Sequence, residues 1–509
     1  MVSFGKYLLG EMMMNLANSS NGYALGNGGL AFIGVYVLAL IGIGLLGHRA
    51  KKEDTLEDHY LGGRAFGFSV LFLTLYATQY SGNSFMGFVG KAYRGGFPII
   101  YTVIAMMAVI GGYYMYAPRL FRLSRKQKYV TLGDYVQDRF SYRPLTILIV
   151  LIGIFGLGNY VLTNLLALGK LAEVVSGNRV DFNYAVIGLA IVMLIYETLG
   201  GMRSVAWTDV TQGVILLVSL GFIAFALFFH LGGPMGVSEG LELTRPDIWN
   251  PPDMTQKITW LSSALLFFFG ISMYPHAIQR IYAARDEKTL RRSFQVMAFM
   301  PLVTTFFLVL LGIMAIAIFP GLERSESDRT TLFMVGKLIE ELPSLAIMGP
   351  LLVAAVIAAT MSTIDSALLA ISSMVTNDIY RVRFPNSSNV TLTRVGKITS
   401  IVIMVVVVVL TINLQNQTIW RLLEIKLEVL AQIAPAVMLG TQIKKIGAYP
   451  VFIGAFFGTL SAVYITISSS PKPFGVHAGI WGLIVNVILI TIIYKGTYAG
   501  RTGRPSDAK

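Results

Sequence analysis

Residues 351–380 read LLVAAVIAATMSTIDSALLAISSMVTNDIY, a long apolar stretch with small hydroxyl residues and one carboxylate near its middle. Ser362, Thr363, Asp365 and Ser366 fall where a membrane-spanning helix would lie near the centre of the bilayer. A charged side chain at that depth costs roughly 2.5–3.5 kcal/mol on insertion scales, so it usually marks a pathway for an ion or a solute. Hydroxyl and carboxylate oxygens are hard donors, which suit a small hard cation better than a soft metal. The stretch therefore predicts a cation pathway through a membrane.

The composition of the whole chain agrees with membrane embedding. Hydrophobic residues make up 55% of the 509 residues and charged residues only 13%, whereas soluble domains carry about 25% charged residues. At roughly 20 apolar residues per span, the chain predicts an all-α polytopic membrane protein with about 13 transmembrane helices. The absence of cysteine excludes disulfides and thiolate metal sites. The expected spans are 29–47, 66–92, 97–118, 145–173, 182–200, 209–230, 259–284, 294–319, 344–376, 393–413, 417–440, 448–468 and 476–495, with the main external loops at 231–258 and 320–343.

The distribution of positive charge predicts the orientation of the chain. The net charge is +13, which in a soluble protein would point to nucleic acid. Here most Lys and Arg residues lie in alternate loops, so the positive-inside rule explains them and we expect no nucleic-acid partner. The N-terminus is then outside and the C-terminus cytoplasmic, in a multi-pass protein of the cell membrane.

Two of the expected spans contain residues that interrupt a helix. The span at 66–92 carries polar residues and a glycine near its middle, namely Gln79, Ser81, Gly82, Asn83 and Ser84. The span at 259–284 contains Gly270 and Pro275. Broken helices are tolerated in a membrane where they line a cavity, and they commonly form the binding sites of secondary transporters.

The two interrupted spans are five apart, which predicts two five-helix repeats. Residues 66–230 form the first repeat and residues 259–440 the second. Residues 1–28 are an external segment without the features of a cleavable signal peptide. Residues 29–47 are a flanking helix, residues 448–495 two C-terminal helices, and residues 496–509 a cytoplasmic tail.

Five segments together carry a resemblance to a known family. They are DHYLGGRAFG (58–67), TLGDYVQDRF (131–140), LGGMRSVAWTDVTQG (199–213), YPHAIQRIYAARD (274–286) and ATMSTIDSALLAISSMVTNDIY (359–380). With these in order, the chain resembles the sodium/solute symporter family, which includes proline, pantothenate, monocarboxylate and sugar symporters. The resemblance implies a LeuT-like fold of two inverted five-helix repeats with flanking spans.

The resemblance also implies a sodium ion as the coupling ion. Its ligands would be the backbone carbonyls of Ala77, Tyr80 and Ala359 and the hydroxyls of Ser362 and Thr363. The alternative is that the small hydroxyl residues only allow close helix packing, as they often do in membranes.

A second cation is implied by the family members that bind two sodium ions. Its ligands would be Asp209, Asp365 and Ser366, together with Ser362. Asp365 stands where the family usually has a small residue. Two nearby carboxylates would repel each other when the site is empty, which would raise one pKa and allow a proton to replace sodium. Alternatively, Asp209 is a helix N-terminal acid favoured by the helix dipole. Gln79, where proline symporters have an aspartate, leaves the coupling ion and its stoichiometry open.

The solute is expected to bind beside the sodium site, at polar side chains covered by aromatic ones. This pattern of few polar groups in a mostly apolar pocket is typical of small-molecule sites. The alternative for the aromatic residues is a position in the core or facing lipid. The residues expected to contact the solute are Gln79, Asn83, Ser84, Tyr160, Phe267 and Ile271.

Two charged clusters remain. Arg280 is expected to pair with Asp286 or Asp209 near the inner gate. On the expected span 417–440, Glu424 and Glu428 are spaced to pair with Arg421. The latter cluster, which also contains Lys426, predicts an outward-facing polar vestibule.

We therefore expect a sodium-coupled secondary active symporter of a small organic solute, and not an enzyme. A monocarboxylate or an amino acid such as proline is the first choice of solute, and pantothenate or another anion stays open. A solute sensor of the same fold, a proton-coupled symporter and a passive channel are the alternatives. The expected partners are the solute and the lipid bilayer, and we expect a monomer to suffice.

Overall fold

The computed structural model describes residues 24–49, 56–230, 233–324, 326–341 and 348–502. These residues are helical apart from connecting turns and one isolated β-bridge between Phe66 and Ala284. Eight helices are long and apolar enough to cross a membrane, or nine if the bent pair Met254–Met273 and Pro275–Ala283 is one span. The all-α membrane fold is thus confirmed. The predicted number of thirteen spans is not, although shorter apolar helices at Asn27–Ala39, Phe68–Gln79 and Phe182–Ile195 fall at further predicted spans.

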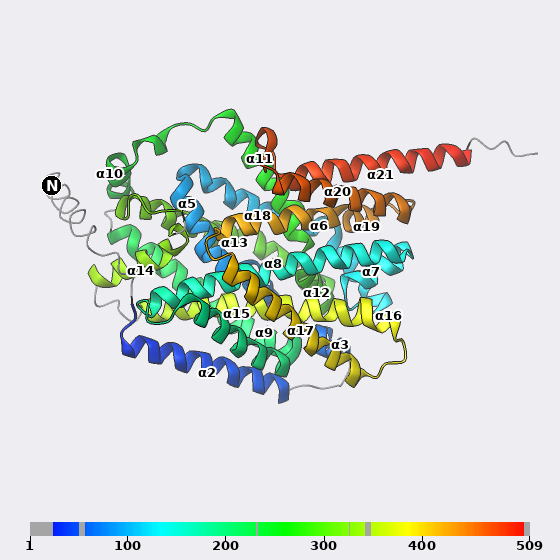
Figure 1. The fold of residues 1–509 in the computed structure, drawn as a ribbon, viewed down its shortest axis with the longest axis horizontal. Helices are drawn as coiled ribbons and strands as arrows, with labels where there is room; N and C mark the ends of the chain where they lie inside the picture. The colour runs from blue at the N-terminus through cyan, green and yellow to red at the C-terminus, as the bar shows by residue number, and fades with distance from the viewer. Residues whose placement is uncertain (1–23, 50–55, 231–232, 325, 342–347, 503–509) are drawn as a thin grey trace, which may run out of the picture.

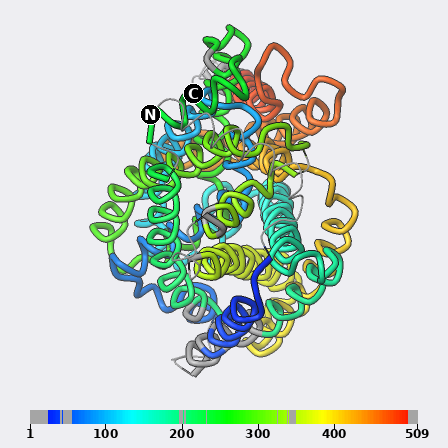
Figure 2. Tube along the Cα trace, turned by 90° about the vertical axis from the view of Figure 1, so that its left-hand side faces the viewer, coloured from blue at the N-terminus to red at the C-terminus, as the bar shows by residue number. Residues whose placement is uncertain are grey.

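The helices form an elongated bundle in which most run along the same direction (Figure 1). In that view α2 (Asn27–Arg49) lies along the lower edge and α21 (Ala478–Thr502) along the upper edge. Figure 2 looks along the bundle, with many helices seen end-on. The most apolar part of the segment that contains α15 (Met348–Met374) is 94% buried, against 28% for α17 (Asn389–Asn413). The hydroxyl-rich stretch therefore forms a central helix and α17 a peripheral one.

Both predicted helix breaks are present. The first separates α4 (Phe68–Gln79) from a π-helical segment at Asn83–Phe88 and from α5 (Val89–Gly95), with Tyr80 in an extended conformation at φ −108° and ψ 94°. The second separates α11 (Met254–Gly270) from α12 (Pro275–Ala283) by a bend of 55°. Pro275 has no backbone N–H to continue the ladder of α11, which gives this break a local cause.

Six further helices contribute to the bundle and mostly match predicted spans. Helix α9 joins two of these, 182–200 and 209–230, and turns at Gly201, whose φ of 60° suits glycine. The six helices are α6 (Tyr101–Gln127), α8 (Arg143–Val175), α9 (Phe182–His230), α13 (Glu287–Ile318), α18 (Ile419–Leu430) and α20 (Ala448–Ile467).

The predicted external loops are partly helical, which corrects the sequence interpretation. Residues 231–258 include α10 (Gly233–Thr244), and residues 320–343 include α14 (Thr330–Glu341). Both helices are short, 12 residues each, and pack against α13. Polar loop composition hid them, because a helix that packs on one side needs only a narrow apolar stripe. Most of the predicted external segment 1–28 and half of the tail 496–509 lie outside the described residues.

The segments that flank the two broken helices are tied together at one end of the bundle. Phe66 donates its N–H to the Ala283 carbonyl at 3.1 Å, and Arg285 donates to the Phe66 carbonyl at 2.9 Å. Arg125, from α6, donates to the Arg285 carbonyl at 2.6 Å. The start of α4 and the end of α12 are therefore held side by side, on the side predicted to be cytoplasmic.

Candidate ion and solute site

The break in α4 lies directly against the central helix α15. Gly82 packs so close to Thr360 that a Cβ added to Gly82 would lie within 3.1 Å of the Thr360 Cβ and Cγ2 atoms and would clash with its Oγ1. Thr363, one turn further along α15, donates to the Ala359 carbonyl at 2.8 Å and lies 3.5 Å from the Ala77 carbonyl. The close approach brings backbone carbonyls of the break next to hydroxyls of α15.

The five residues predicted to bind sodium are all buried at this contact. Each of them is at most 1% exposed, so any cation held there would be shielded from solvent. The Ser362 hydroxyl donates to a carboxylate oxygen of Asp209. A hydroxyl that donates its proton keeps its two lone pairs, which remain available to a cation. The residues are Ala77, Tyr80, Ala359, Ser362 and Thr363.

Asp209, on α9, forms a fully buried ion pair with Arg280, on α12. The Arg280 Nη2 atom lies 2.9 Å from the Asp209 Oδ2 atom, and both side chains are 0% exposed. Thr74 and Ser362 also donate to Asp209, and Arg280 Nε lies 2.9 Å from the Thr74 hydroxyl. The predicted pairing of Arg280 with Asp209, one of its two expected partners, is thus confirmed. The pair connects α4, α9, α12 and α15.

Three of the residues predicted for a second cation, Asp209, Ser362 and Ser366, belong to this ion pair or contact it. Ser366 accepts a hydrogen bond of 2.6 Å from Arg280 Nη2. Asp365 is fully buried on the same helix as Ser366. The positive charge next to Asp209 is the Arg280 guanidinium, which the predicted ligand set of the second cation did not include.

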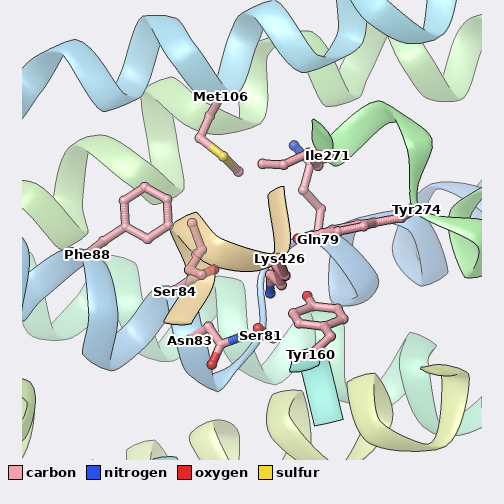
Figure 3. Close-up of a pocket in the computed structure, with 11 residues that line it drawn as sticks. Gln79, Ser81, Asn83, Ser84, Phe88, Met106, Tyr160, Ile271, Tyr274 and Lys426 are labelled. Atoms are coloured by element: carbon pink, nitrogen blue, oxygen red, sulfur yellow. The ribbon is translucent and has the colours of Figure 1, made fainter. Parts of the chain in front are cut away.

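A narrow cavity lies beside the break, enclosed by α4, α6, α8, α18 and the turn between α11 and α12 (Figure 3). Its volume is about 20 Å³. A cavity needs about 10–15 Å³ of such volume to hold a water molecule, so this cavity has room for one or two waters. An organic solute can bind there only if the surrounding helices separate. The lining residues are Gln79, Ser81, Asn83, Ser84, Phe88, Met106, Tyr160, Ile271, Tyr274, Leu423 and Lys426.

Five of the six residues expected to contact the solute line this cavity. The exception is Phe267, which packs edge-on against the Phe88 ring at a centroid distance of 6.4 Å and so lies behind the cavity wall. Tyr160 donates its hydroxyl to the Thr78 carbonyl at 2.8 Å, which satisfies a backbone group near the end of α4. The sequence interpretation missed Tyr274 as a lining residue, although it directly precedes the predicted break at Pro275.

The sequence interpretation placed Lys426, a candidate functional residue, in the wrong surroundings. It was grouped with Arg421, Glu424 and Glu428, but its side chain points into the cavity (Figure 3). Residues two apart on a helix point about 200° apart. Lys426 therefore faces away from both glutamates, and helical spacing was the signal that could have separated it from them.

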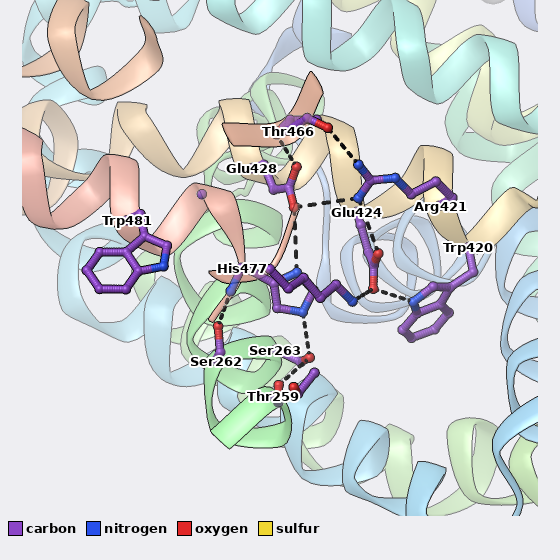
Figure 4. Close-up of polar contacts among 12 residues, drawn as sticks. Thr259, Ser262, Ser263, Trp420, Arg421, Glu424, Glu428, Thr466, His477 and Trp481 are labelled. Carbon is purple, nitrogen blue, oxygen red and sulfur yellow. Dashed lines mark hydrogen bonds and ion pairs between the residues drawn. The ribbon is translucent and has the colours of Figure 1, made fainter. Parts of the chain in front are cut away.

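The other charged residues of α18 form a separate network (Figure 4). Arg421 Nη1 lies 3.7 Å from Glu424 and 3.9 Å from Glu428, which confirms the predicted pairing. Lys472 Nζ lies 2.7 Å from Glu424, and His477 Nδ1 lies 3.6 Å from Glu428. Both glutamates are buried. Their partners Lys472 and His477 come from the loop between α20 and α21.

Comparison with known proteins gives the chain its family. The model of the sodium:solute symporter family matches residues 59–460. The osmoregulated proline transporter OpuE of Bacillus subtilis (strain 168) is 26% identical over 472 residues, which cover 91% of this chain and 93% of that protein. A sodium/proline symporter of Staphylococcus aureus (strain JH9) is 27% identical over 481 residues, covering 91% and 92%.

Solved structures agree in fold. The substrate-bound, outward-open structure of a Na⁺-coupled sialic acid symporter has a TM-score of 0.76 at 20% identity, covering 92% of this chain and 98% of that one. MhsT in complex with L-phenylalanine has a TM-score of 0.55 at 14% identity, covering 83% and 97%. The predicted LeuT-like fold is confirmed. The chain belongs to the sodium:solute symporter family and is a membrane transporter, not an enzyme.

Proposed function

We propose that this chain is a sodium-driven symporter of a small organic solute, a monocarboxylate or an amino acid such as proline, working by alternating access. The observation that carries the proposal is the contact between the broken helix α4 and the hydroxyls of α15, with Thr363 Oγ1 3.5 Å from the Ala77 carbonyl. A cavity lined by residues of the same break adjoins it. The family and the names of the relatives support both sodium and a small solute.

The sodium ion is proposed to bind at the carbonyls of Ala77, Tyr80 and Ala359 and the hydroxyls of Ser362 and Thr363. These five oxygens carry no net charge, so an ion that enters can also leave, as transport requires. The oxygen donors fit a hard cation. Their burial at a helix break fits the discontinuous helices that hold ions in secondary transporters.

Sodium binding and solute binding are coupled because both sites use residues of the break in α4. A sodium ion held between α4 and α15 would order residues 79–84, and several of these line the solute cavity. The solute, by ordering the same residues, would favour sodium binding to the same extent, because coupling between two binding equilibria is reciprocal.

The proposed orientation has the N-terminus outside and the C-terminus in the cytoplasm. It rests on the concentration of Lys and Arg in alternate loops. We further propose that one chain suffices for transport, because the ion and solute sites are built from helices of a single chain.

The test is uptake by the purified protein in liposomes. A panel of labelled monocarboxylates, amino acids, pantothenate and sugars is offered with and without an inward sodium gradient. We expect accumulation of one class above its external concentration only with the sodium gradient. Accumulation driven equally by a proton gradient without sodium would favour the proton-coupled alternative. Sodium-independent equilibration would indicate a channel, and solute binding without uptake would indicate a sensor.

The second cation at Asp209, Asp365 and Ser366 is a separate proposal. Because Arg280 already balances the charge of Asp209, we expect a second cation to require the guanidinium to move. Asp365→Asn is then expected to lower the number of sodium ions per solute, or to remove a pH dependence of uptake. Stoichiometry from reversal potentials in liposomes measures this. Unchanged stoichiometry and pH dependence would remove Asp365 from the coupling site.

Gly82→Ala is expected to separate the break from α15. The added methyl group would overlap the Thr360 side chain, and overpacking of this kind costs about 1–3 kcal/mol. We expect a lower melting temperature and weaker sodium dependence of uptake. Gly158→Ala is the matched control, because a Cβ at Gly158 meets nothing within 4 Å. Equal behaviour of the two variants would contradict the close contact.

A further inference from the structure

Lys426 places a buried amino group at the cavity without a partner for its N–H donors. Its side chain is 0% exposed, and among the described residues its Nζ atom has no hydrogen-bond acceptor. Burying a charge without a partner is costly, and charged groups inside membrane proteins mark substrate or ion pathways. The amino group is therefore expected to have a partner that arrives with the solute.

Aromatic rings hold the amino group but do not neutralise it. Its Nζ atom lies 3.6 Å from the centroid of the Tyr160 ring and 5.5 Å from that of Tyr274. Such cation–π contacts are attractive, but they supply neither an oxygen acceptor nor a negative charge. Glu424 and Glu428, the nearest acids along α18, are engaged with Arg421, Lys472 and His477 on the other side of the helix.

A second unsatisfied donor lies in the same cavity. The side-chain amide nitrogen of Gln79 is buried and, within the described part of the chain, has no acceptor. One carboxylate has two oxygens and can accept from both groups, and its bonds to a charged donor are the stronger kind. Phe88, Met106 and Leu423 supply apolar surface for the rest of a short solute.

Among the residues that the structure describes, the cavity has no acidic counterpart for a positively charged solute group: none of those that line it is Asp or Glu. An ammonium group bound there would be near the Lys426 amino group, and like charges in a poorly solvated site repel strongly. The charge balance favours a net anion over a zwitterion.

We propose that Lys426 determines specificity and that the solute is a small organic monocarboxylate without an amino group. Its carboxylate binds Lys426 Nζ and the Gln79 amide, and its apolar part contacts the opposite wall. The proposal rests on the proposed symport function and narrows it from monocarboxylates and amino acids to the former class.

The experiment compares carboxylates with neutral and zwitterionic solutes in proteoliposomes under an inward sodium gradient. Labelled propionate, lactate and pyruvate are the substrates, and unlabelled propionamide, lactamide and L-proline are the competitors. We expect sodium-driven uptake of at least one monocarboxylate and at least tenfold weaker competition by its amide and by proline. A wild-type protein that takes propionamide or proline as well as any monocarboxylate overturns the proposal.

Lys426→Met tests the role of the amino group. We expect at least a tenfold loss of carboxylate uptake and a carboxylate-to-amide selectivity that falls to about one, a change that a purely structural defect would not produce. Lys426→Arg is expected to keep the selectivity, and Lys257→Met, at an exposed position of α11, to keep both rate and selectivity. Unchanged selectivity in a folded Lys426→Met protein overturns the proposal.

Failure of this inference can be distinguished from failure of the proposed symport function. Sodium-driven uptake of proline that is insensitive to Lys426→Met overturns this inference but leaves the symport function standing. Absence of sodium-driven uptake of any solute in the panel overturns the symport function itself. If Lys426→Met does not yield folded protein, the competition series with the wild-type protein decides the question alone.

Discussion

Asp209→Asn is expected to lower the free energy of unfolding by about 3–5 kcal/mol, the usual cost of breaking a buried ion pair from one side. The carboxylate is fully buried, lies 2.9 Å from the Arg280 guanidinium, and accepts from the hydroxyls of Thr74 and Ser362. Asparagine keeps the shape but leaves a buried guanidinium without its counter-charge. Unfolding in a detergent titration measures the difference, and uptake is expected to be lost with it.

A double variant distinguishes the contribution of the ion pair to stability from that of side-chain packing. Asp209→Asn combined with Arg280→Met removes both charges, so it is expected to be more stable than Asp209→Asn alone. Glu287→Gln is the matched control, because Glu287 pairs with Arg291 at 2.7 Å on the protein surface, where such pairs contribute about 0–1 kcal/mol. A double variant whose loss equals the sum of the two single losses would contradict the buried-pair argument.

Thr363→Val is expected to raise the sodium concentration for half-maximal uptake by about 10- to 150-fold. The substitution keeps the shape of the side chain but removes the hydroxyl that lies between the Ala359 and Ala77 carbonyls. Loss of a polar contact to a charged partner costs about 1.5–3 kcal/mol, which gives this range. The measurement is initial uptake rate in proteoliposomes over a series of sodium concentrations.

Thr411→Val serves as the control for this change. Thr411 is equally buried on α17, and its hydroxyl donates to the Val407 carbonyl of its own helix at 2.8 Å. We expect that variant to leave the sodium dependence unchanged. A Thr363→Val protein that folds and shows wild-type sodium dependence would remove Thr363 from the proposed ion site.

The broken helices could be predicted from the sequence because their causes are local. Pro275 lacks the N–H that a helix needs, and a run of small polar residues around Gly82 weakens α4. The apolar stretch of α15, with Ser362 and Thr363 in its middle, likewise indicated a membrane-spanning helix with oxygen donors near mid-bilayer. Family segments then connected these two places, and the structure brings them into contact.

The loops were less predictable. Helices α10 and α14 lie in segments that are too polar to read as spans, and packing against neighbouring helices, α13 among them, stabilises them. Glu197, in the segment LIYETLGG (194–201), has a side chain that lies outside the described part of the structure.

What the sequence determined by itself was the membrane class, the two breaks, the hydroxyl-rich membrane helix and the family, because each of these is written in contiguous residues. Only the tertiary structure decided which buried charges meet. Asp209 and Arg280 are 71 positions apart, and helix packing makes them partners. Lys426 lies between two glutamates in sequence, yet the rotation of α18 turns it to the opposite side, into the cavity. A polar residue in a span looks the same in sequence whichever way it faces, since that direction is set by neighbouring helices.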